Sequence, residues 1–177
     1  MLRKSDFKLK EDILSHVEEA FEKLYFDYHK LVMYFAFTRI GDRQEAEDVT
    51  QEVFMKIYSN IDDFNPYLAT FKTWLVTITR NHVADYLKQR KDFIILDNDI
   101  VDNALDEPYF SDKFLYSVRT LEEKERDILV LKVVYSFTHQ EIAKALNITI
   151  DVSKKKYAYA KKVAKGEWKE YEKQFQA

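Results

Sequence analysis

The scarcity of glycine and proline is the feature that most constrains how this chain can fold. Only two of each occur in 177 residues, whereas Lys, Glu, Leu and aromatic residues are abundant. Sheet proteins of this length usually need more Gly and Pro for their turns. Apolar residues make up 46% of the chain, which is enough to bury a core. We therefore expect a folded, all-α protein.

Several classes of protein are excluded by composition. The chain has no Cys, which excludes disulfides, zinc–cysteine sites and thiol catalysis. Its four His are far apart in the sequence, so we predict no metal site and no cofactor. The first residues are charged and form no apolar export signal, and the longest apolar run is far shorter than the roughly 20 residues that span a bilayer. We expect a cytoplasmic protein without membrane insertion and without enzymatic activity.

The charge is distributed unevenly along the chain. Residues 1–91 carry a net charge of −1, residues 92–112 carry −7 with no Lys or Arg, and residues 113–177 carry +5, in agreement with the total of −3. This pattern predicts two small helical domains, 1–91 and 113–177, joined by an acidic linker. A basic C-terminal domain indicates a polyanionic partner such as nucleic acid. An ordinary solvated linker and one with a function of its own remain equally open.

The first domain has the apolar spacing of a three- or four-helix bundle over about 15–91. Gly41 is placed to end one helix in the left-handed conformation, and Asp42 with Glu45 resembles a capping box that begins the next. Residues 60–68 contain Asn-Pro and predict a loop. Thr70 can cap a third helix, in which Trp74 belongs to the apolar stripe and is predicted to be a core residue.

The C-terminal domain carries the pattern of a helix-turn-helix. Thr138 and Glu141 form a second capping box, small Ala143 permits close helix packing, and Asn147 tolerates a turn with positive φ. A lysine-rich helix follows over about 151–165. Cations on a helix after such a turn can reach phosphates or base edges in a major groove. Any pair of packed helices can imitate this pattern.

Both halves together resemble the extracytoplasmic-function (ECF) class of bacterial RNA polymerase sigma factors, in the sigma-70 family. Region two is matched over about 15–91 and region four over about 115–165. The region-two strings are Gly41-Asp42-Arg43, Ala46-Glu47-Asp48-Val49, Gln51-Glu52-Val53-Phe54, Phe71-Lys72-Thr73-Trp74-Leu75, Arg80-Asn81 and Asp85. The region-four strings are Leu121-Glu122-Glu123-Lys124-Glu125-Arg126 and His139-Gln140-Glu141-Ile142-Ala143.

The resemblance implies core RNA polymerase and promoter DNA as partners. Region two would dock on the clamp helices of the largest subunit, and region four on the flap. The implied core-binding residues form one acidic, hydrogen-bonding face: Glu47, Asp48, Gln51 and Glu52. A merely solvated face is the alternative, and a paired-carboxylate metal site lacks a third ligand.

The resemblance also implies a site that opens the promoter's minus-ten element, where an unstacked base is held by the protein. The base-capturing loop would supply Phe64, Asn65 and Tyr67. Candidates for contacts to the DNA backbone are Lys72, Arg80, Lys88, Arg90 and Lys91. The residues expected to face DNA on the same helix are Thr73, Thr77 and Asn81. For Trp74, stacking on a base is the alternative to the predicted core role.

In region four the resemblance implies a recognition helix for the minus-thirty-five element. The candidates are Lys154, Lys155, Lys156, Tyr159 and Lys162. Related proteins commonly have several Arg here, and a buried valine at the position of Ser153. Lys lacks the planar fork that pairs with guanine, so we predict phosphate binding with strong salt dependence. A helix that only solvates its own outer face is the alternative.

Three hypotheses about function follow. A sigma factor accounts for both halves, whereas a stand-alone helix-turn-helix regulator accounts only for the second. A sigma-like adaptor or decoy would keep docking without promoter recognition. Within the first hypothesis, the acidic linker could occupy a basic channel as an RNA mimic. Proteins of this class are often held by an anti-sigma factor, and such a partner is an open expectation.

Overall fold

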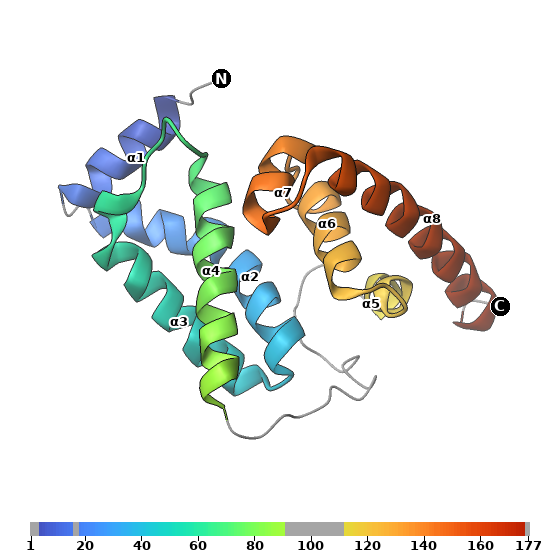
Figure 1. Cartoon of the computed structure of the whole chain (residues 1–177). Helices are drawn as coiled ribbons and strands as arrows, with labels where there is room; N and C mark the ends of the chain where they lie inside the picture. Colours follow the sequence, from blue (N-terminus) through green and yellow to red (C-terminus); the bar gives the residue numbers. More distant parts are fainter. Residues whose placement is uncertain (1–3, 16–17, 91–111, 176–177) are drawn as a thin grey trace. The chain divides into compact units, whose positions relative to one another are not determined.

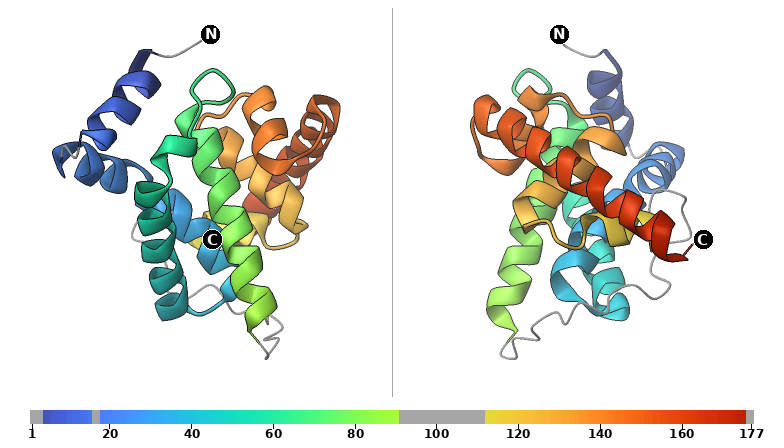
Figure 2. Two further views of the ribbon diagram at one scale, coloured as in Figure 1. Left: turned by 60° about the vertical axis from the view of Figure 1, so that its left-hand side comes forward. Right: turned by 90° about the vertical axis from the view of Figure 1, so that its right-hand side faces the viewer.

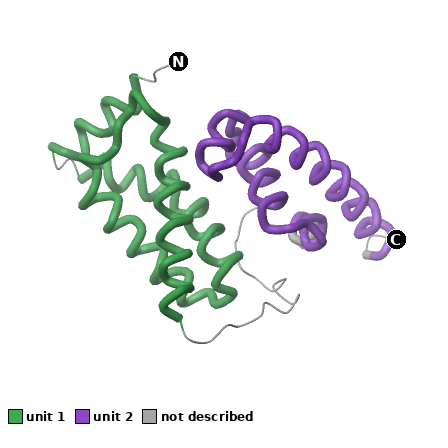
Figure 3. Tube along the Cα trace, in the orientation of Figure 1, with its two compact units in different colours: residues 1–95 green, residues 96–177 purple. Residues whose placement is uncertain are grey.

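The computed structural model describes residues 4–15, 18–90 and 112–175 (Figure 1). The chain divides into two compact units, unit 1 (residues 1–95) and unit 2 (residues 96–177) (Figure 3). Every regular element in the described ranges is a helix, which confirms the predicted all-α class. The predicted domain limits stay predictions, because residues 91–111 lie outside the described part of the chain.

Unit 1 is a bundle of three long helices, α2, α3 and α4, each of which contacts the other two. Its core holds Leu31, Phe35, Val53, Phe71 and Leu75, all buried. A further helix, α1, packs on α2 and on the 3₁₀ turn η1 (Figures 1 and 2). The bounds are α1 Lys4–Leu14, α2 Glu18–Ile40, α3 Arg43–Ser59, η1 Ile61–Asp63 and α4 Phe71–Gln89.

The predicted helix ends in unit 1 are largely confirmed. Gly41 has φ of 79°, and its N–H donates to the Phe37 carbonyl at 2.9 Å, which ends α2. The Asp42 carboxylate caps α3 by accepting the Glu45 N–H at 2.8 Å. The Glu45 carboxylate is directed to α4, where it accepts the Tyr86 hydroxyl. Thr70 is the N-cap residue of α4, but its hydroxyl contacts the Thr73 hydroxyl and makes no capping bond.

Helix α1 was not predicted from the sequence, which placed the start of the bundle near residue 15. Ile13 is its buried residue. The loop expected at 60–68 is present and contains η1. The position of α1 against this loop is a long-range feature that local periodicity does not reveal.

Unit 2 is organised around one long helix, α8, which packs on the three others. Val118, Leu121, Leu129 and Ala160 form a buried cluster that Phe114 and Tyr157 cover in part. The bounds are α5 Asp112–Val118, α6 Glu123–Val133, α7 His139–Leu146 and α8 Ile150–Phe175.

Helix α8 continues about ten residues beyond its predicted end near Lys165. The extension packs against α5: the rings of Tyr116 and Tyr171 are 5.3 Å apart, and Arg119 pairs with Glu167 at 3.4 Å. These partners lie more than 45 residues apart in sequence, so the apolar spacing around 151–165 did not predict them. No helix within the described ranges is both long and apolar enough to cross a membrane.

The helix-turn-helix predicted in unit 2 is confirmed. Thr138 and Glu141 make both bonds of the capping box that begins α7. Asn147 ends α7 in the left-handed conformation with φ of 53°, and the Ile148 N–H donates to the Ala143 carbonyl at 2.9 Å. Asn tolerates this conformation because its short polar side chain can bond locally. The turn therefore passes the chain directly into α8.

Candidate functional site

The four residues predicted for core binding lie on α3 within one arc, with Glu47 and Glu52 at its two edges. Glu47 and Glu52 are five residues apart, about 140° around a helix. Glu47 is bound by His29 of α2, with Nε2 and Oε1 3.0 Å apart. Glu52 is bound by His82 of α4, with Nε2 and Oε2 2.8 Å apart. The two glutamates therefore lie on opposite flanks of α3, each held by a neighbouring helix.

Asp48 and Gln51 lie between these flanks, and both are exposed. Met55 extends the same strip, because residues three, four and seven positions apart share a helix face. Its side chain is 70% exposed. We call Asp48, Gln51 and Met55 the outer α3 face. Sequence reasoning missed Met55, although its position outside the apolar stripe of α3 was a usable signal.

The predicted base-capturing loop is only partly a surface. Phe64 is fully buried, with its ring 5.4 Å from Phe71 and 5.2 Å from Trp74. The expectation that Phe64 could stack on a base is wrong for this conformation, because its ring fills the core. Tyr67 is 71% exposed, and Asn65 is also exposed. The Asn65 Oδ1 accepts the Tyr67 N–H at 3.0 Å, which shapes the turn between them.

The α4 candidates also divide by burial. Thr73 is buried with its hydroxyl bonded to Thr70, so it cannot face DNA as predicted. Thr77 is half-buried and donates to the Thr73 carbonyl, whereas Asn81 is exposed. Trp74 is half-buried against Phe64 and Phe71, in accord with its predicted core role. The side chains of Lys72 and Arg80 are half-buried.

The basic end of α4 contains one available cation and one engaged cation. Lys88 pairs with Asp85 at 3.0 Å on an exposed surface, and this pairing lowers the pKa of Asp85. Exposed pairs of this kind are weak, so a phosphate can replace the carboxylate. Arg90 is bound to Glu45 at 3.0 Å and to the Ile40 carbonyl at 3.3 Å. The predicted phosphate role of Arg90 is therefore corrected to an internal contact. Lys91 and the acidic linker at 92–111 lie outside the described residues.

Helix α8 presents a basic strip to solvent. Lys155, Tyr159 and Lys162 follow one another at spacings of four and three residues and all are exposed, Tyr159 by 56%. We call these three residues the basic α8 face. Lys154 is exposed beside it. In this arrangement the aromatic ring of Tyr159 has one lysine on each side of it along the helix.

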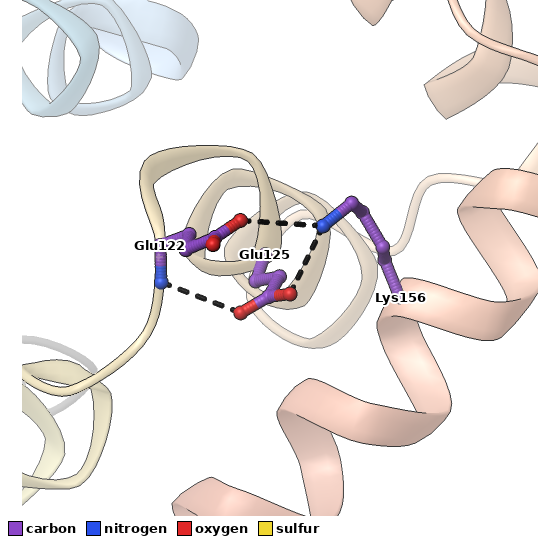
Figure 4. Close-up of polar contacts among 3 residues, drawn as sticks. All are labelled: Glu122, Glu125 and Lys156. Atoms are coloured by element: carbon purple, nitrogen blue, oxygen red, sulfur yellow. Dashed lines mark hydrogen bonds and ion pairs between the residues drawn. The ribbon is translucent and has the colours of Figure 1, made fainter.

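Lys156, also predicted to bind phosphate, is instead engaged inside unit 2. Its Nζ lies 3.0 Å from Glu125 and 3.5 Å from Glu122 (Figure 4). Glu125 is nearly buried and closes the capping box of α6 by accepting the Glu122 N–H. The hydrogen bond to Glu125 is the main cause of the raised pKa of Lys156. Its predicted role in phosphate binding is therefore corrected: Lys156 forms an ion pair that joins α8 to α6.

Ser153 is buried where the resemblance led us to expect valine, and its hydroxyl has a partner. His139 Nδ1 lies 2.9 Å from Ser153 Oγ, which ties α7 to α8 across the turn. Burial lowers the pKa of His139, and Lys132 and Lys154 lower it further. The neutral imidazole is therefore the favoured form. Within the described ranges, no group of three His, Asp or Glu side chains could hold a metal ion.

Comparison with known proteins accounts for both units. The family model of sigma-70 region 2 matches residues 24–93, and that of sigma-70 region 4 matches residues 111–162. The ECF RNA polymerase sigma factor SigW of Bacillus subtilis is 27% identical over 155 residues, which cover 77% of this chain and 82% of SigW. SigX of the same organism is 25% identical over 148 residues, which cover 75% of each chain.

Solved structures show the same fold. CnrH, in complex with the cytosolic domain of CnrY, has a TM-score of 0.64 at 18% identity and covers 92% of this chain and 96% of its own. The sigma factor RpoE of Bartonella quintana, in complex with the anti-sigma factor NepR, has a TM-score of 0.63 at 21% identity, with coverages of 84% and 96%. From both family models and these relatives, the chain belongs to the sigma-70 family, in its extracytoplasmic-function class of RNA polymerase sigma factors.

Proposed function

We propose that this sigma factor docks on core RNA polymerase through the outer α3 face and contacts promoter DNA through one surface in each unit. The observation that carries the docking proposal is the division of α3. Its flanking glutamates are bound by His29 and His82, whereas Asp48 and Gln51 project into solvent opposite the buried stripe. An exposed strip of an acid, an amide and a methionine suits a partner helix that is basic at one point and apolar at another.

The clamp helices of the polymerase's largest subunit are the proposed partner of this face. Glu47 and Glu52 would form its rim, because their carboxylates remain partly accessible beside the histidines. Rim charges influence the rate of association more than the final affinity. The centre of the strip should therefore dominate the binding energy.

In unit 1 the proposed DNA surface is the exposed part of the loop and of α4. Tyr67 would stack on an unstacked base, and the amide of Asn65 would bond a base edge. Lys88 would bind the phosphate backbone of the DNA. Further contacts from α4 to the DNA would come from Lys72, Arg80, Thr77 and Asn81. The exposed ring of Tyr67 supports this assignment.

In unit 2 the basic α8 face is the proposed surface for the minus-thirty-five element. It follows directly on the helix-turn-helix, whose second helix enters the major groove in proteins of this type. Lys155 and Lys162 would bind phosphates and Tyr159 would contact base edges or methyl groups. Four expectations stay predictions. They are a contact of unit 2 with the polymerase flap, binding of an anti-sigma factor, RNA mimicry by the acidic linker, and action in the cytoplasm. The proposed function assigns the chain no chemistry of its own.

Co-elution with sigma-free core polymerase tests the docking proposal. The native chain should bind tightly and the Asp48→Ala/Gln51→Ala variant should lose binding. Glu19→Ala/Glu22→Ala, on exposed positions of α2, removes one negative charge more and should still bind normally. Equal binding by all three would refute the assignment of the outer α3 face.

Run-off transcription with the reconstituted holoenzyme tests the DNA surfaces. Tyr67→Ala should assemble with core but open promoters poorly. Lys155→Ala/Lys162→Ala should also assemble with core but transcribe poorly. Lower salt should restore part of its transcription, because salt screens the remaining phosphate contacts less. Normal transcription by either variant would remove that surface from the proposal.

A further inference from the structure

Helix α1, which the family models do not cover, holds the loop between α3 and α4 by two kinds of contact. The Lys10 ammonium donates to the Asp62 carbonyl at 2.7 Å and to the Phe64 carbonyl at 2.6 Å. The Phe7 ring meets the Tyr67 ring edge-on, with centroids 4.9 Å apart and an interplanar angle of 77°. These contacts join residues more than 50 positions apart and lie where α1 and the loop run side by side in Figure 1.

Lys10 fixes the part of the loop from which Asn65 projects. Its two bonds are charge-assisted, and such bonds are shorter and stronger than those between neutral groups. Phe64 is then held twice: its carbonyl by Lys10, and its ring by Phe71 and Trp74 in the core. Both the backbone and the side chain of the residue directly before Asn65 are therefore restrained.

The remainder of the loop is also restrained, but its recognition groups stay open. Pro66 has a fixed φ, and the Asn65 side chain binds the Tyr67 N–H. Phe7 packs on the Tyr67 ring in a T-shaped arrangement, and Tyr67 still exposes 71% of its surface. Helix α1 thus supports Tyr67 and leaves most of its surface accessible.

We infer that Lys10 and Phe7 are positioning residues for recognition of the single-stranded minus-ten element. By holding the loop in one conformation before DNA arrives, they reduce the ordering cost of binding. The inference rests on the proposed role of Asn65 and Tyr67 in base capture. It assigns α1 a part in promoter opening without any contact to DNA.

The test measures binding of the reconstituted holoenzyme to a fluorescent single-stranded DNA, selected from a random pool by the native holoenzyme. Lys10→Met removes both hydrogen bonds to the loop and should weaken binding about tenfold, a loss comparable to the net contribution of one charge-assisted hydrogen bond. Lys8→Met removes the same charge from an exposed position of the same helix and should stay within about twofold. Equal affinities for the two variants would overturn the inference.

The salt dependence separates positioning from direct contact. A lysine that binds a phosphate of single-stranded DNA contributes about 0.7 to the slope of log K against log salt. A positioning lysine contributes nothing, so Lys10→Met should have the native slope at lower affinity. A slope reduced by the contribution of one phosphate would overturn the inference in favour of direct contact.

Two further measurements make the result independent of misfolding and of the proposed function. Trp74 packs on Phe64, so in a Trp168→Phe background Lys10→Met should increase quenching of its fluorescence by acrylamide without DNA. Co-elution with core should be normal. If Tyr67→Ala and Asn65→Ala both bind DNA like the native chain, the proposal of base capture by the loop is wrong. If these two variants bind weakly but Lys10→Met binds like the native chain, only the role of α1 is refuted.

Discussion

Helices α3 and α8 carry opposite charge but divide their charged residues in the same way. On α3, His29 and His82 bind the two flanking glutamates and leave Asp48 between them in solvent. On α8, Glu125 binds Lys156 and leaves Lys155 and Lys162 exposed. In each helix some charged side chains attach the helix to a neighbour and others are exposed, and we propose that the exposed ones contact a partner. The spacing of the charges does not show which side chains belong to which group.

The two helices differ in how firmly the attached charges are held. The side chains of Glu47 and Glu52 are 40% and 57% exposed, whereas that of Glu125 is 10% exposed. A partly exposed pair can exchange its partner at little cost, but breaking a buried pair leaves an uncompensated charge. We therefore expect the flanks of α3 to adapt on binding and the Lys156 pair to persist.

The largest effect is expected at the centre of the outer α3 face. Asp48→Lys should weaken binding to core polymerase about 100-fold or more, because the charge is reversed at the centre of the proposed interface. Glu47→Gln/Glu52→Gln should cost about fivefold or less. Competition with the labelled native chain for core measures both. Equal losses of affinity would show that the residues at the centre and at the rim contribute equally to binding.

Next comes the ion pair that distinguishes Lys156 from its neighbours. Lys156→Met should lower the free energy of unfolding of unit 2 by about 1–3 kcal/mol, because Glu125 is left nearly buried and unpaired. Thermal denaturation followed by circular dichroism measures the loss. Adding Glu125→Gln should recover part of it, and Lys155→Met should change stability by less than about 0.5 kcal/mol. A destabilisation as large for Lys155→Met would erase the distinction within α8.

A smaller effect separates phosphate binding from attachment on α8. For duplex promoter DNA, Lys155→Ala/Lys162→Ala should reduce the slope of log K against log salt by about two, because each lysine that binds a phosphate contributes close to one. Binding titrations of the holoenzyme over a range of salt give the slope. Lys169→Ala/Lys173→Ala, further along α8, carries the same charge change and should retain the native slope.

The smallest effect is the pH dependence that arises from His139. Its pKa is lowered from 6.5 in the folded chain, so the unfolded chain binds the proton more tightly. The stability of unit 2 should therefore decrease as the pH falls through 6.5, and His139→Gln should reduce this dependence. Denaturation in urea at a series of pH values measures it. A stability that rises on acidification would contradict the assigned sign.

Much of the fold follows from local signals in the sequence. Gly41, Asp42, the Thr138–Glu141 box and Asn147 each act on groups within about four residues, and the structure confirms them at those positions. The region-two and region-four strings that carry the family resemblance are likewise short, ordered runs of residues. Such signals survive without knowledge of the tertiary structure, because their partners are neighbours in the chain.

Three of the wrongly assigned site residues have partners outside this short range. Phe64 is buried by Phe71 and Trp74, Arg90 is bound by Glu45, and Lys156 is bound by Glu125. Residue type shows that these side chains are large or charged and therefore able to contact DNA. It does not show which other residues of the protein they contact. Exposure of a long side chain is a property of the packed molecule.

The sequence by itself thus determined the helical class, the ends marked by Gly41, Asp42, Thr138 and Asn147, the helix-turn-helix and the family, because these depend on composition and short-range geometry. The tertiary structure decided which charged side chains are exposed and revealed α1 packed against the loop between α3 and α4. The physical reason is that Lys10 and Asp62, Glu45 and Arg90, and Glu125 and Lys156 meet only when helices pack. Packing selects, from each set of chemically equivalent residues, those that hold the protein together and those left free to bind.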